Sequence, residues 1–256
     1  MGLARALSKM GFCSRSEAFA LIRSGRVRLN GVLTKNPEAA VRMEKAAIEV
    51  DRTPVHSAVK VYWMMNKPRS LVTTADDEQG RETVYAKLPK GLPWLSPVGR
   101  LDRASEGLLL FTNDSEWAAR IMAPESHLDK TYHVQIGTVA QDKQLRSLER
   151  GVTVEDGEIL RAKRVRRIRE GEKNSWIEVV LHQGRNRQIR RMFKQLGIET
   201  LRLIRVSIGP LELGDLAKGA AREVTATEKA AIDGALRGRL LTANKTGAYR
   251  KLPIAE

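Results

Sequence analysis

The sequence contains one cysteine, four histidines and few aromatic residues, which make up 5% of the chain. The single cysteine, Cys13, excludes an intramolecular disulfide and any zinc site built from cysteines. The histidines, at positions 56, 127, 133 and 182, lack the close spacing typical of metal ligands, so we expect no metal site. There is also no apolar run of membrane-spanning length, no lipidation signal and no glycine-rich phosphate loop of the Walker or dinucleotide type. These absences predict a protein with no metal or nucleotide cofactor and no membrane partner.

Acidic residues are scarce as well. The chain of 256 residues has 30 Asp and Glu against 45 Lys and Arg, which gives a formal net charge of +15 and a pI near 10.2. Such an excess is typical of proteins that bind a polyanion such as nucleic acid, although it carries no information on the fold. Residues 1–7 contain no hydrophobic segment of secretory length, so we expect a cytoplasmic protein. The length is sufficient for two domains, each with its own core.

The first fifty residues are predicted to form a separate unit. Leu3, Leu7 and Met10 follow helical spacing, and Ser14 with Glu17 is a capping box at the start of a second helix. Apolar residues alternate around Asn-Gly in residues 27–33, which predicts a β-hairpin, and residues 48–50 form a third short strand. Residues 51–58 carry Pro54 and no periodicity, so we expect a linker there.

Basic residues follow one side of this unit, at Arg15, Arg23, Arg26 and Arg28. The segments 14–18 and 25–31 resemble the alpha-L (S4-like) RNA-binding domain, which also occurs in a small-subunit ribosomal protein. The resemblance implies that these arginines bind RNA phosphates, which gives affinity and orientation but little base specificity. A merely solvated basic face is the alternative.

The most informative stretch is residues 99–114, Gly-Arg-Leu-Asp-Arg-Ala-Ser-Glu-Gly-Leu-Leu-Leu-Phe-Thr-Asn-Asp. Asp102 lies between Arg100 and Arg103, and an arginine nearby stabilises the ionised form of a carboxylate, which suits a nucleophile or a base. An ordinary ion pair in a Gly-Arg turn is the alternative. The apolar run 108–111 predicts a central strand. The whole block resembles the signature of RsuA-type pseudouridine synthases (the RsuA/RluB/RluE/RluF branch), in which the Asp after Gly-Arg-Leu is catalytic.

Two further segments carry the same resemblance. In the predicted strand 130–136, Tyr132 shares a face with Val134 and Ile136, which by itself predicts a core residue. The resemblance implies instead that Tyr132 stacks on the target uracil, a contact worth roughly 1–3 kcal/mol per base. In residues 200–210, which alternate as a buried strand, Leu203 matches an apolar residue that lines the family's active site. Leu201 is the alternative there, and either leucine suits a core.

Residues 188–196 have apolar side chains at helical spacing on one face and arginines on the other. Such a basic face is usually solvated or contacts RNA phosphates generically. The resemblance implies that Arg190 pairs with Asp102 and that Arg100, Arg185 and Arg187 contact the RNA backbone. Residues 160–169 are dense in arginine and are predicted to form a strand or rim that follows phosphates.

The predicted architecture is α+β, with an alpha-L domain in residues 1–56 and a catalytic domain in residues 59–236 built on a mixed, largely antiparallel sheet. Residues 115–123 fit a helix, and a capping box at Thr225 and Glu228 begins a short helix to about residue 236. Residues 237–256 are interpreted as a basic, partly disordered tail. The family usually has Gly two residues after the Lys-Pro pair of residues 67–68, whereas this chain has Ser70.

The resemblance implies isomerisation of uridine to pseudouridine in ribosomal RNA, a reaction that requires no cofactor. Residues 80–84 and the Leu-Pro pair that follows favour large-subunit (23S-type) over small-subunit RNA. We expect a monomer whose partner is ribosomal RNA or a pre-ribosomal particle. The target uridine, and whether Asp102 acts as nucleophile or base, stay open. A non-catalytic ribosome assembly factor is one alternative, and a metal-dependent nuclease using Asp76, Asp77 and Asp114 is another, for which no motif is present.

Overall fold

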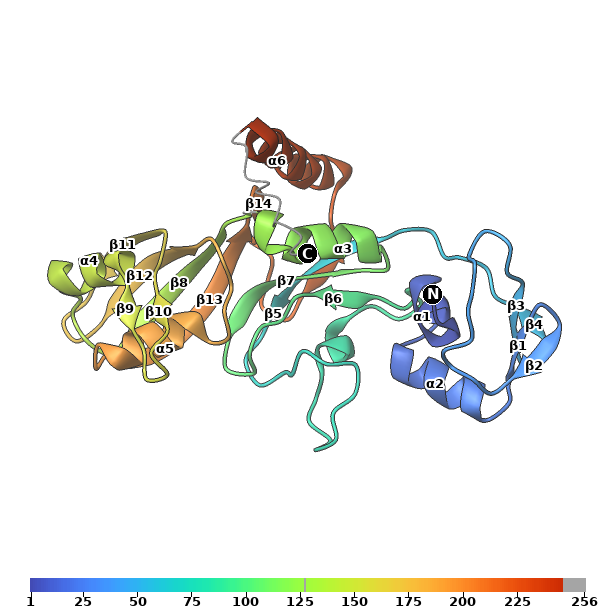
Figure 1. Ribbon diagram of the computed structural model, residues 1–256. Coiled ribbons are helices and arrows are strands. Elements are labelled where there is room, and N and C mark those ends of the chain that lie inside the picture. Colours follow the sequence, from blue (N-terminus) through green and yellow to red (C-terminus); the bar gives the residue numbers. More distant parts are fainter. Residues whose placement is uncertain (127, 246–256) are drawn as a thin grey trace, which may run out of the picture.

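The computed structural model describes residues 1–126 and 128–245, with side chains as far as Arg237. Figure 1 shows an elongated molecule, with the N-terminal helices and a small sheet at one end and a larger sheet at the other. No helix within these residues is long and apolar enough to cross a membrane. The α+β class expected from the sequence is confirmed, since six α-helices accompany mostly antiparallel sheets in the described chain.

The N-terminal unit has two helices and a four-stranded sheet with strand order β2-β1-β3-β4. Its elements are α1 (Leu3–Lys9), α2 (Arg15–Arg23), β1 (Val27–Leu29), β2 (Val32–Thr34), β3 (Ile48–Val50) and β4 (Thr53–Pro54). The predicted capping box is confirmed, because the Ser14 hydroxyl accepts from the Glu17 amide and the Glu17 carboxylate accepts from the Ser14 amide. Asn30 and Gly31 have φ values of 52° and 79°, as a tight hairpin turn between β1 and β2 requires.

The segment expected to be an irregular linker is partly ordered. Thr53–Pro54 pairs with β3, so the four-stranded sheet extends into residues 51–58. The prediction missed this strand because two residues are too short for any periodicity to show. The core of the N-terminal unit is nonetheless its own, formed by residues that include Leu3, Leu7 and Ile22.

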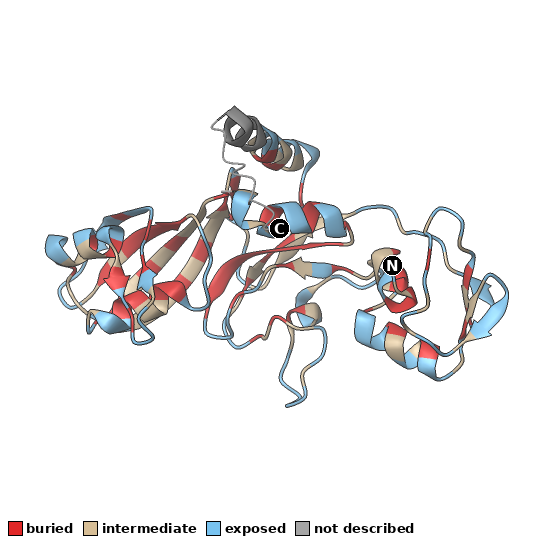
Figure 2. Cartoon of the chain, in the orientation of Figure 1, coloured by how far each residue is buried: buried red, intermediate tan, exposed pale blue. Residues whose placement is uncertain are grey.

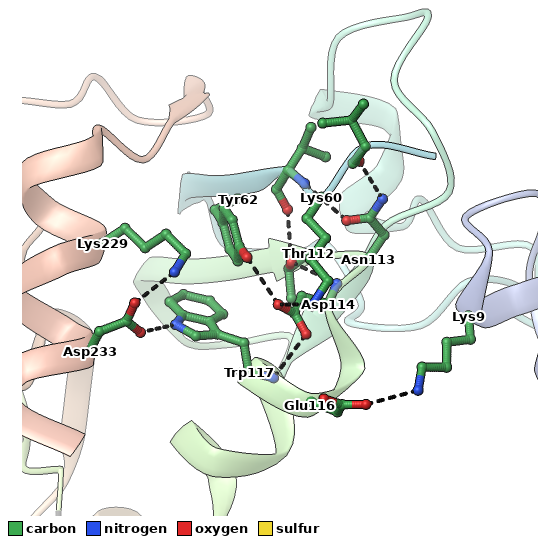
Figure 3. A network of polar contacts seen from close by, with 12 residues as sticks. Lys9, Lys60, Tyr62, Thr112, Asn113, Asp114, Glu116, Trp117, Lys229 and Asp233 are labelled. Atoms are coloured by element: carbon green, nitrogen blue, oxygen red, sulfur yellow. Dashed lines mark hydrogen bonds and ion pairs between the residues drawn. The ribbon is translucent and has the colours of Figure 1, made fainter. Parts of the chain in front are cut away.

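A small polar junction joins the N-terminal unit to the rest of the chain. The amide of Trp94 donates to the carbonyl of Gly11 at 2.8 Å. The ammonium of Lys9 pairs with the carboxylate of Glu116 at 2.9 Å, and Figure 3 shows this pair reaching across from α1 to the helix α3 (Ser115–Met122). Glu116 is largely exposed, so this ion pair contributes little to stability.

The larger unit is built on one sheet of nine strands in the described chain, in the order β11-β12-β8-β13-β7-β5-β15, with β14 on β13 and β6 on β7. Its strands are β5 (Tyr62–Lys67), β6 (Ser96–Val98), β7 (Glu106–Thr112), β8 (Lys130–Ile136), β11 (Arg164–Glu170), β12 (Ser175–Leu181), β13 (Thr200–Ile208), β14 (Leu211–Glu212) and β15 (Ala221–Glu223). β7 and β13 run parallel, and the other pairs of this sheet are antiparallel. The mixed, largely antiparallel sheet is therefore confirmed.

The remaining elements surround this sheet. They are η1 (Val84–Lys87), η2 (Pro124–Ser126), α4 (Asp142–Arg150), the two-stranded pair β9 (Val152–Thr153) and β10 (Ile159–Leu160), α5 (Gln188–Gln195) and α6 (Ala226–Lys245). The C-terminal helix is longer than expected: it was predicted to end near residue 236, with a basic tail from 237, but it continues to Lys245. The rest of the expected tail, residues 246–256, lies outside the described residues.

The strand β7 is buried along its whole length, as Figure 2 shows in red. Leu109 and Phe111 on one face belong to a core that includes residues of α4 and α5. Leu108 and Leu110 on the other face pack with residues of α3 and α6. A strand covered on both faces reads as a continuous apolar run, which explains the sequence of residues 108–111.

Candidate active site

An open cavity of ≈ 450 Å³ lies where four separated segments of the larger unit meet. Most of its lining comes from the loop before β7, from β8, from β13 and from the residues leading into α5, with further contributions from the end of α3 and the end of β12. Of the residues predicted from the sequence, it brings together Asp102, Tyr132, Leu203, Arg100, Arg185 and Arg187. Positions more than 100 residues apart in the chain thus share one cavity.

A buried lysine, Lys67, donates hydrogen bonds to the backbone of the loop that carries Asp102. The ammonium of Lys67 donates to the carbonyl oxygens of Pro68 and Asp102, both at 3.1 Å, and to that of Ser105 at 2.9 Å. Its side chain is fully buried, and burial lowers the pKa of Lys67 to about 8 against the opposing effect of the Asp102 and Glu106 charges. Lys67 is not among the residues predicted from the sequence. The available signal was a charged residue on the same face of the strand as the buried Met65.

Further bonds fix the loop at both ends. The hydroxyl of Thr73 donates to the Leu101 carbonyl at 2.7 Å, and the Ser105 amide donates to the Asp102 carbonyl at 2.9 Å, which closes a turn. Asp102 itself is exposed, and the described chain offers its carboxylate no ion pair. The backbone of Asp102 is therefore fixed while its carboxylate points into an accessible space.

Glu106, at the end of this loop, is buried and doubly paired. Its carboxylate accepts two hydrogen bonds from Arg202, both at 3.0 Å, and pairs with Lys218 at 2.7 Å. Burial raises the pKa of this carboxyl, but the bonds from Arg202 and Lys218 outweigh burial and lower it overall. This network holds the first residue of β7 in place.

Arg190 does not form the direct ion pair with Asp102 that the resemblance implied. Its Nη2 donates instead to the carbonyl of Ala104 at 3.2 Å, and its Nη1 lies 3.5 Å from the carbonyl of Thr200. Burial lowers the pKa of the Arg190 guanidinium, and the nearby charge of Asp102 acts in the opposite direction. Arg190 therefore binds the backbone of the loop that carries Asp102 and interacts with the Asp102 carboxylate through space. A sequence motif does not distinguish a direct ion pair from this arrangement.

Tyr132 and Leu203 lie side by side on the sheet. In the antiparallel pair of β8 and β13, Tyr132 is opposite Arg205 and Leu203 is opposite Val134. The exposed fractions of Tyr132 and Leu203 are 9% and 6%, and both line the cavity. Between the two leucines left open by the sequence, Leu203 is the one at the cavity, whereas Leu201 contacts the region of Gly137.

Arg205 is a cavity residue that the sequence analysis missed. Only 6% of its surface is exposed, and its Nε donates to the carbonyl of Leu108 at 2.7 Å. Its Nη2 is buried without an acceptor in the described chain. The signal was present in the alternation of β13, because residue 205 shares the inward face of Leu203.

The arginines at the cavity rim differ in how far their charge is already paired. Arg100 and Arg187 are exposed, and Arg187 has a φ of 47° at the start of α5. Arg185 pairs with Glu158 and also lines a neighbouring groove of ≈ 660 Å³ that contains Arg150, Arg161 and Lys163. A basic surface thus continues from the cavity.

The positive charge of strand β11 is partly neutralised by neighbouring acids, so fewer of its arginines are free to bind phosphates than the sequence predicts. Arg164 and Arg166 both pair with Glu178, at 3.1 and 2.8 Å, and Arg167 pairs with Asp142 and Glu170. Three of its four arginines therefore neutralise acids of their own surroundings, which argues against a rim devoted to phosphates.

On the N-terminal unit, Arg15 and Arg23 are exposed, and the Arg23 guanidinium lies 5.8 Å from the centre of the Phe19 ring. Arg26 forms a two-bond ion pair with Asp51, and Arg28 donates to the Gly31 carbonyl at 2.8 Å. Two of the four predicted RNA-binding arginines thus already have protein partners.

The acids named for a nuclease have structural partners. Asp114 caps α3 by accepting from the Trp117 amide, and it also accepts from the Tyr62 hydroxyl at 3.0 Å and pairs with Lys60 at 2.9 Å (Figure 3). Asp77 pairs with Arg81. Within the residues described, no cluster of three or more His, Cys, Asp or Glu suits a metal ion.

Comparison with known proteins gives the same assignment over nearly the whole chain. Residues 61–195 match the family model of RNA pseudouridylate synthase, and residues 1–45 match that of the S4 domain. The chain is 37% identical over 231 residues to ribosomal large subunit pseudouridine synthase B of Bacillus subtilis, covering 88% of this chain and 93% of that protein. It is 36% identical to the protein of the same name in Shigella flexneri, covering 82% and 74%.

A solved structure described as a crystal structure of pseudouridylate synthase superposes with a TM-score of 0.64 and 27% identity, covering 91% of this chain and 99% of that one. A family match over more than half of the chain, together with relatives of this identity and coverage, decides the assignment. The chain that carries this cavity belongs to the RNA pseudouridylate synthase family, with an S4 domain at its N-terminus.

Proposed function

We propose that this pseudouridine synthase isomerises a specific uridine of large-subunit ribosomal RNA, with Asp102 as its catalytic residue. The observation that carries the proposal is the meeting of an unpaired carboxylate, Asp102, with the aromatic ring of Tyr132 in one cavity. The relatives named as large-subunit enzymes in Bacillus subtilis and Shigella flexneri support the substrate class. The sequence of residues 80–84 supports the same choice over small-subunit RNA.

The reaction explains why these side chains are needed. The bond between the sugar C1′ and N1 of uracil breaks, the uracil turns while it is held, and its C5 bonds to C1′. The target uridine must leave the base stack to reach the cavity. Tyr132 stacks on the flipped base, and Leu203 closes the cavity against water. Asp102 attacks C1′ or removes the 2′ proton of the sugar.

Two residues position Asp102 without touching the substrate. Lys67 binds the carbonyl oxygens of Asp102 and Ser105, and Arg190 binds that of Ala104. A carboxylate on a backbone fixed at these points needs little reorganisation when the substrate arrives. The positive charge of Arg190 also favours the anionic form of Asp102.

The remaining arginines bind the RNA. Exposed Arg100, Arg185 and Arg187 at the rim suit phosphates beside the flipped nucleotide. In our proposal residues 1–56 form a docking domain, in which Arg15, Arg23, Arg26 and Arg28 add affinity, and residues 59–236 form the catalytic domain. The partner is ribosomal RNA or a pre-ribosomal particle, and the enzyme acts as a monomer.

The test combines mapping with catalysis. Pseudouridine is mapped in ribosomal RNA from cells with and without the gene, and the loss of one large-subunit site is expected. In vitro, tritium release from RNA with 5-tritiated uridine is expected from the wild-type enzyme and not from Asp102→Asn, which should still bind RNA. Asp142→Asn, on the exposed start of α4, is the matched control and should release tritium normally.

Two results would contradict the proposal. Loss of a small-subunit site would show that the substrate is the other ribosomal RNA. No release by the wild-type enzyme on any ribosomal RNA or precursor particle would favour a non-catalytic assembly factor.

A further inference from the structure

The guanidinium of Arg205 is a buried positive charge beside the cavity that the structure leaves uncompensated. Its exposed fraction is 6%, and the described chain supplies no ion pair for it. Its Nε is bound to the Leu108 carbonyl, whereas its Nη2 is buried without an acceptor. Two other buried charges of this unit are satisfied: Lys67 has three carbonyl acceptors and Glu106 has two cations. Nε of Arg190 is also buried without an acceptor, but this side chain is only half-buried and both of its Nη atoms reach carbonyl oxygens.

An unpaired buried charge is costly to a folded protein, and proteins neutralise, pair or hydrate such groups. A buried guanidinium with an unpaired donor, the Nη2 of Arg205, therefore indicates a partner that arrives from outside. The residue lines the cavity of Asp102, so the partner is part of the substrate.

The position on the sheet indicates which part of the substrate this is. Arg205 is directly opposite Tyr132 in the β8–β13 pair, and it is two residues from Leu203 on the same strand. Directly opposite residues of an antiparallel pair project from the same face, with β-carbons roughly 4.5–5.5 Å apart. A base stacked on Tyr132 thus has its edge within reach of the Arg205 guanidinium.

Phosphates have other partners in this cavity. Arg100 and Arg187 are exposed at its rim, where the backbone of a flipped nucleotide stays. Arg205 lies on β13 with Leu203 and opposite Tyr132 of β8, the two residues proposed to enclose the base. Burial therefore favours the edge of the base over the backbone as its partner.

We propose that Arg205 is a further catalytic residue, which donates hydrogen bonds to a carbonyl oxygen of the flipped uracil and stabilises the negative charge of the detached base. This inference rests on the proposed function. When the C1′–N1 bond breaks, its electron pair stays with the uracil and spreads over N1, O2 and O4. The sugar is satisfied meanwhile by a bond from Asp102 or by loss of the 2′ proton. After rotation, C5 forms the new bond to C1′, C5 loses its proton and N1 gains one.

The experiment varies the leaving group. Large-subunit ribosomal RNA is transcribed with uridine or with 5-fluorouridine, whose electron-withdrawing fluorine makes the detached base a more stable anion. Single-turnover loss of uridine or 5-fluorouridine is followed by digestion and chromatography of the nucleosides, for wild type, Arg205→Met and Arg205→Lys. With 5-fluorouridine the fluorine stays on C5 after the new C5–C1′ bond forms, so the final loss of a C5 proton does not occur and the measurement reports the steps up to that bond. Removal of one preorganised donor is expected to slow the uridine reaction by about 100-fold or more. The deficit should be several-fold smaller with 5-fluorouridine, and Arg205→Lys should lie between the other two enzymes.

Two further readouts separate this role from a structural one. Replacing an uncompensated buried charge with an apolar side chain is often neutral or stabilising, so the thermal midpoint of Arg205→Met should not fall. RNA affinity should stay near that of wild type. Arg146→Met, on the exposed face of α4, is the matched control and should show no leaving-group effect.

Equal deficits on the two RNAs would overturn the inference and leave the proposed function intact. Loss of RNA affinity with normal turnover would also overturn it, because Arg205 would then bind a phosphate. If Arg205→Met does not fold, the same comparison with Arg205→Lys decides. A wild-type enzyme that converts neither RNA would overturn both proposals.

Discussion

Gly107 of β7 lies directly opposite Arg205 of β13 in the parallel pair that joins the two halves of the large sheet. A β-carbon at position 107 would overlap the carbonyl oxygen of Arg205 and lie 2.7 Å from its amide nitrogen. The φ of Gly107 is +100°, a value that residues with side chains rarely adopt. This close approach brings the loop that carries Asp102, which ends at Ser105, against the strand that carries Leu203 and Arg205.

Replacing Gly107 with alanine should therefore separate β7 from β13. Backbone strain and overlap with a main chain that cannot rotate away predict a loss of about 3 kcal/mol in the free energy of unfolding, measured by urea denaturation. Gly91→Ala is the matched control, because its φ is +85° but nothing lies within 4 Å of the added carbon. It should cost only about 1 kcal/mol. Equal losses in the two variants would show that overlap with Arg205 is unimportant.

Ser70 occupies a turn that suits glycine. Its φ is +76°, and its amide donates to the Arg103 carbonyl at 2.9 Å, so the turn supports the catalytic loop. The turn is kept although this chain has serine where the family usually has glycine. Ser70→Gly should relieve the strained conformation and raise the free energy of unfolding by about 1 kcal/mol. An unchanged or lower urea midpoint for Ser70→Gly would contradict this account.

Lys67 makes the stability depend on pH in a direction that can be tested. Its pKa is lowered to about 8 in the folded protein, below the ordinary value of 10.5. Between these values the unfolded chain binds the proton more readily, so stability rises with pH through this window. The free energy of unfolding of wild type, measured relative to Lys67→Met, should therefore increase from pH 8 to about pH 10. A difference that stays flat over this range would show that burial does not disfavour the charged lysine.

Arg190→Ala should reduce turnover much more than RNA affinity. The change removes the bond to the Ala104 carbonyl and a positive charge near Asp102, so the catalytic loop loses support and the carboxylate loses stabilisation. One cation fewer among many changes RNA binding little. Single-turnover rates are expected to fall by about 100-fold, with Arg146→Ala as the control that keeps its rate. A large loss of affinity with a normal rate would make Arg190 a phosphate contact.

Local patterns explain most of what the sequence predicted. Ser14 with Glu17, and Asn30 with Gly31, act through neighbours a few residues away, and both behave as expected. Alternation in strands 130–136 and 200–208 predicts which residues of each strand share a face. The same patterns do not give the pairing between strands, so the position of Tyr132 opposite Arg205 appears only in the structure.

The failures have physical causes of the same kind. α6 continues past Gly234 to Lys245, so the predicted end near residue 236 was wrong. Helix propensity alone does not determine where a helix ends. The Arg190–Asp102 pair was inferred from a motif, and the structure places the guanidinium on the backbone of the loop instead. The sequence pattern did not identify Lys67 and Arg205 as buried residues. A charged residue at an apolar position of a strand looks like an interruption of the alternation, and its burial becomes clear once its partners are known.

The junction between the two units predicts what happens when residues 1–56 are deleted. The N-terminal core is separate, and the contacts across the junction are few, among them the Lys9–Glu116 ion pair and the bond from the Trp94 amide to Gly11. The remaining chain should therefore fold, with a cooperative thermal transition and only a small loss of stability.

Its affinity for large-subunit ribosomal RNA should fall, and the slope of log K against log salt should become shallower because fewer phosphates are contacted. A truncation after residue 245, at the end of α6, should leave the RNA affinity nearer to that of the full chain. Failure of the 57–256 fragment to fold would contradict the division into two domains, and an unchanged salt slope would show that Arg15, Arg23, Arg26 and Arg28 do not contact RNA.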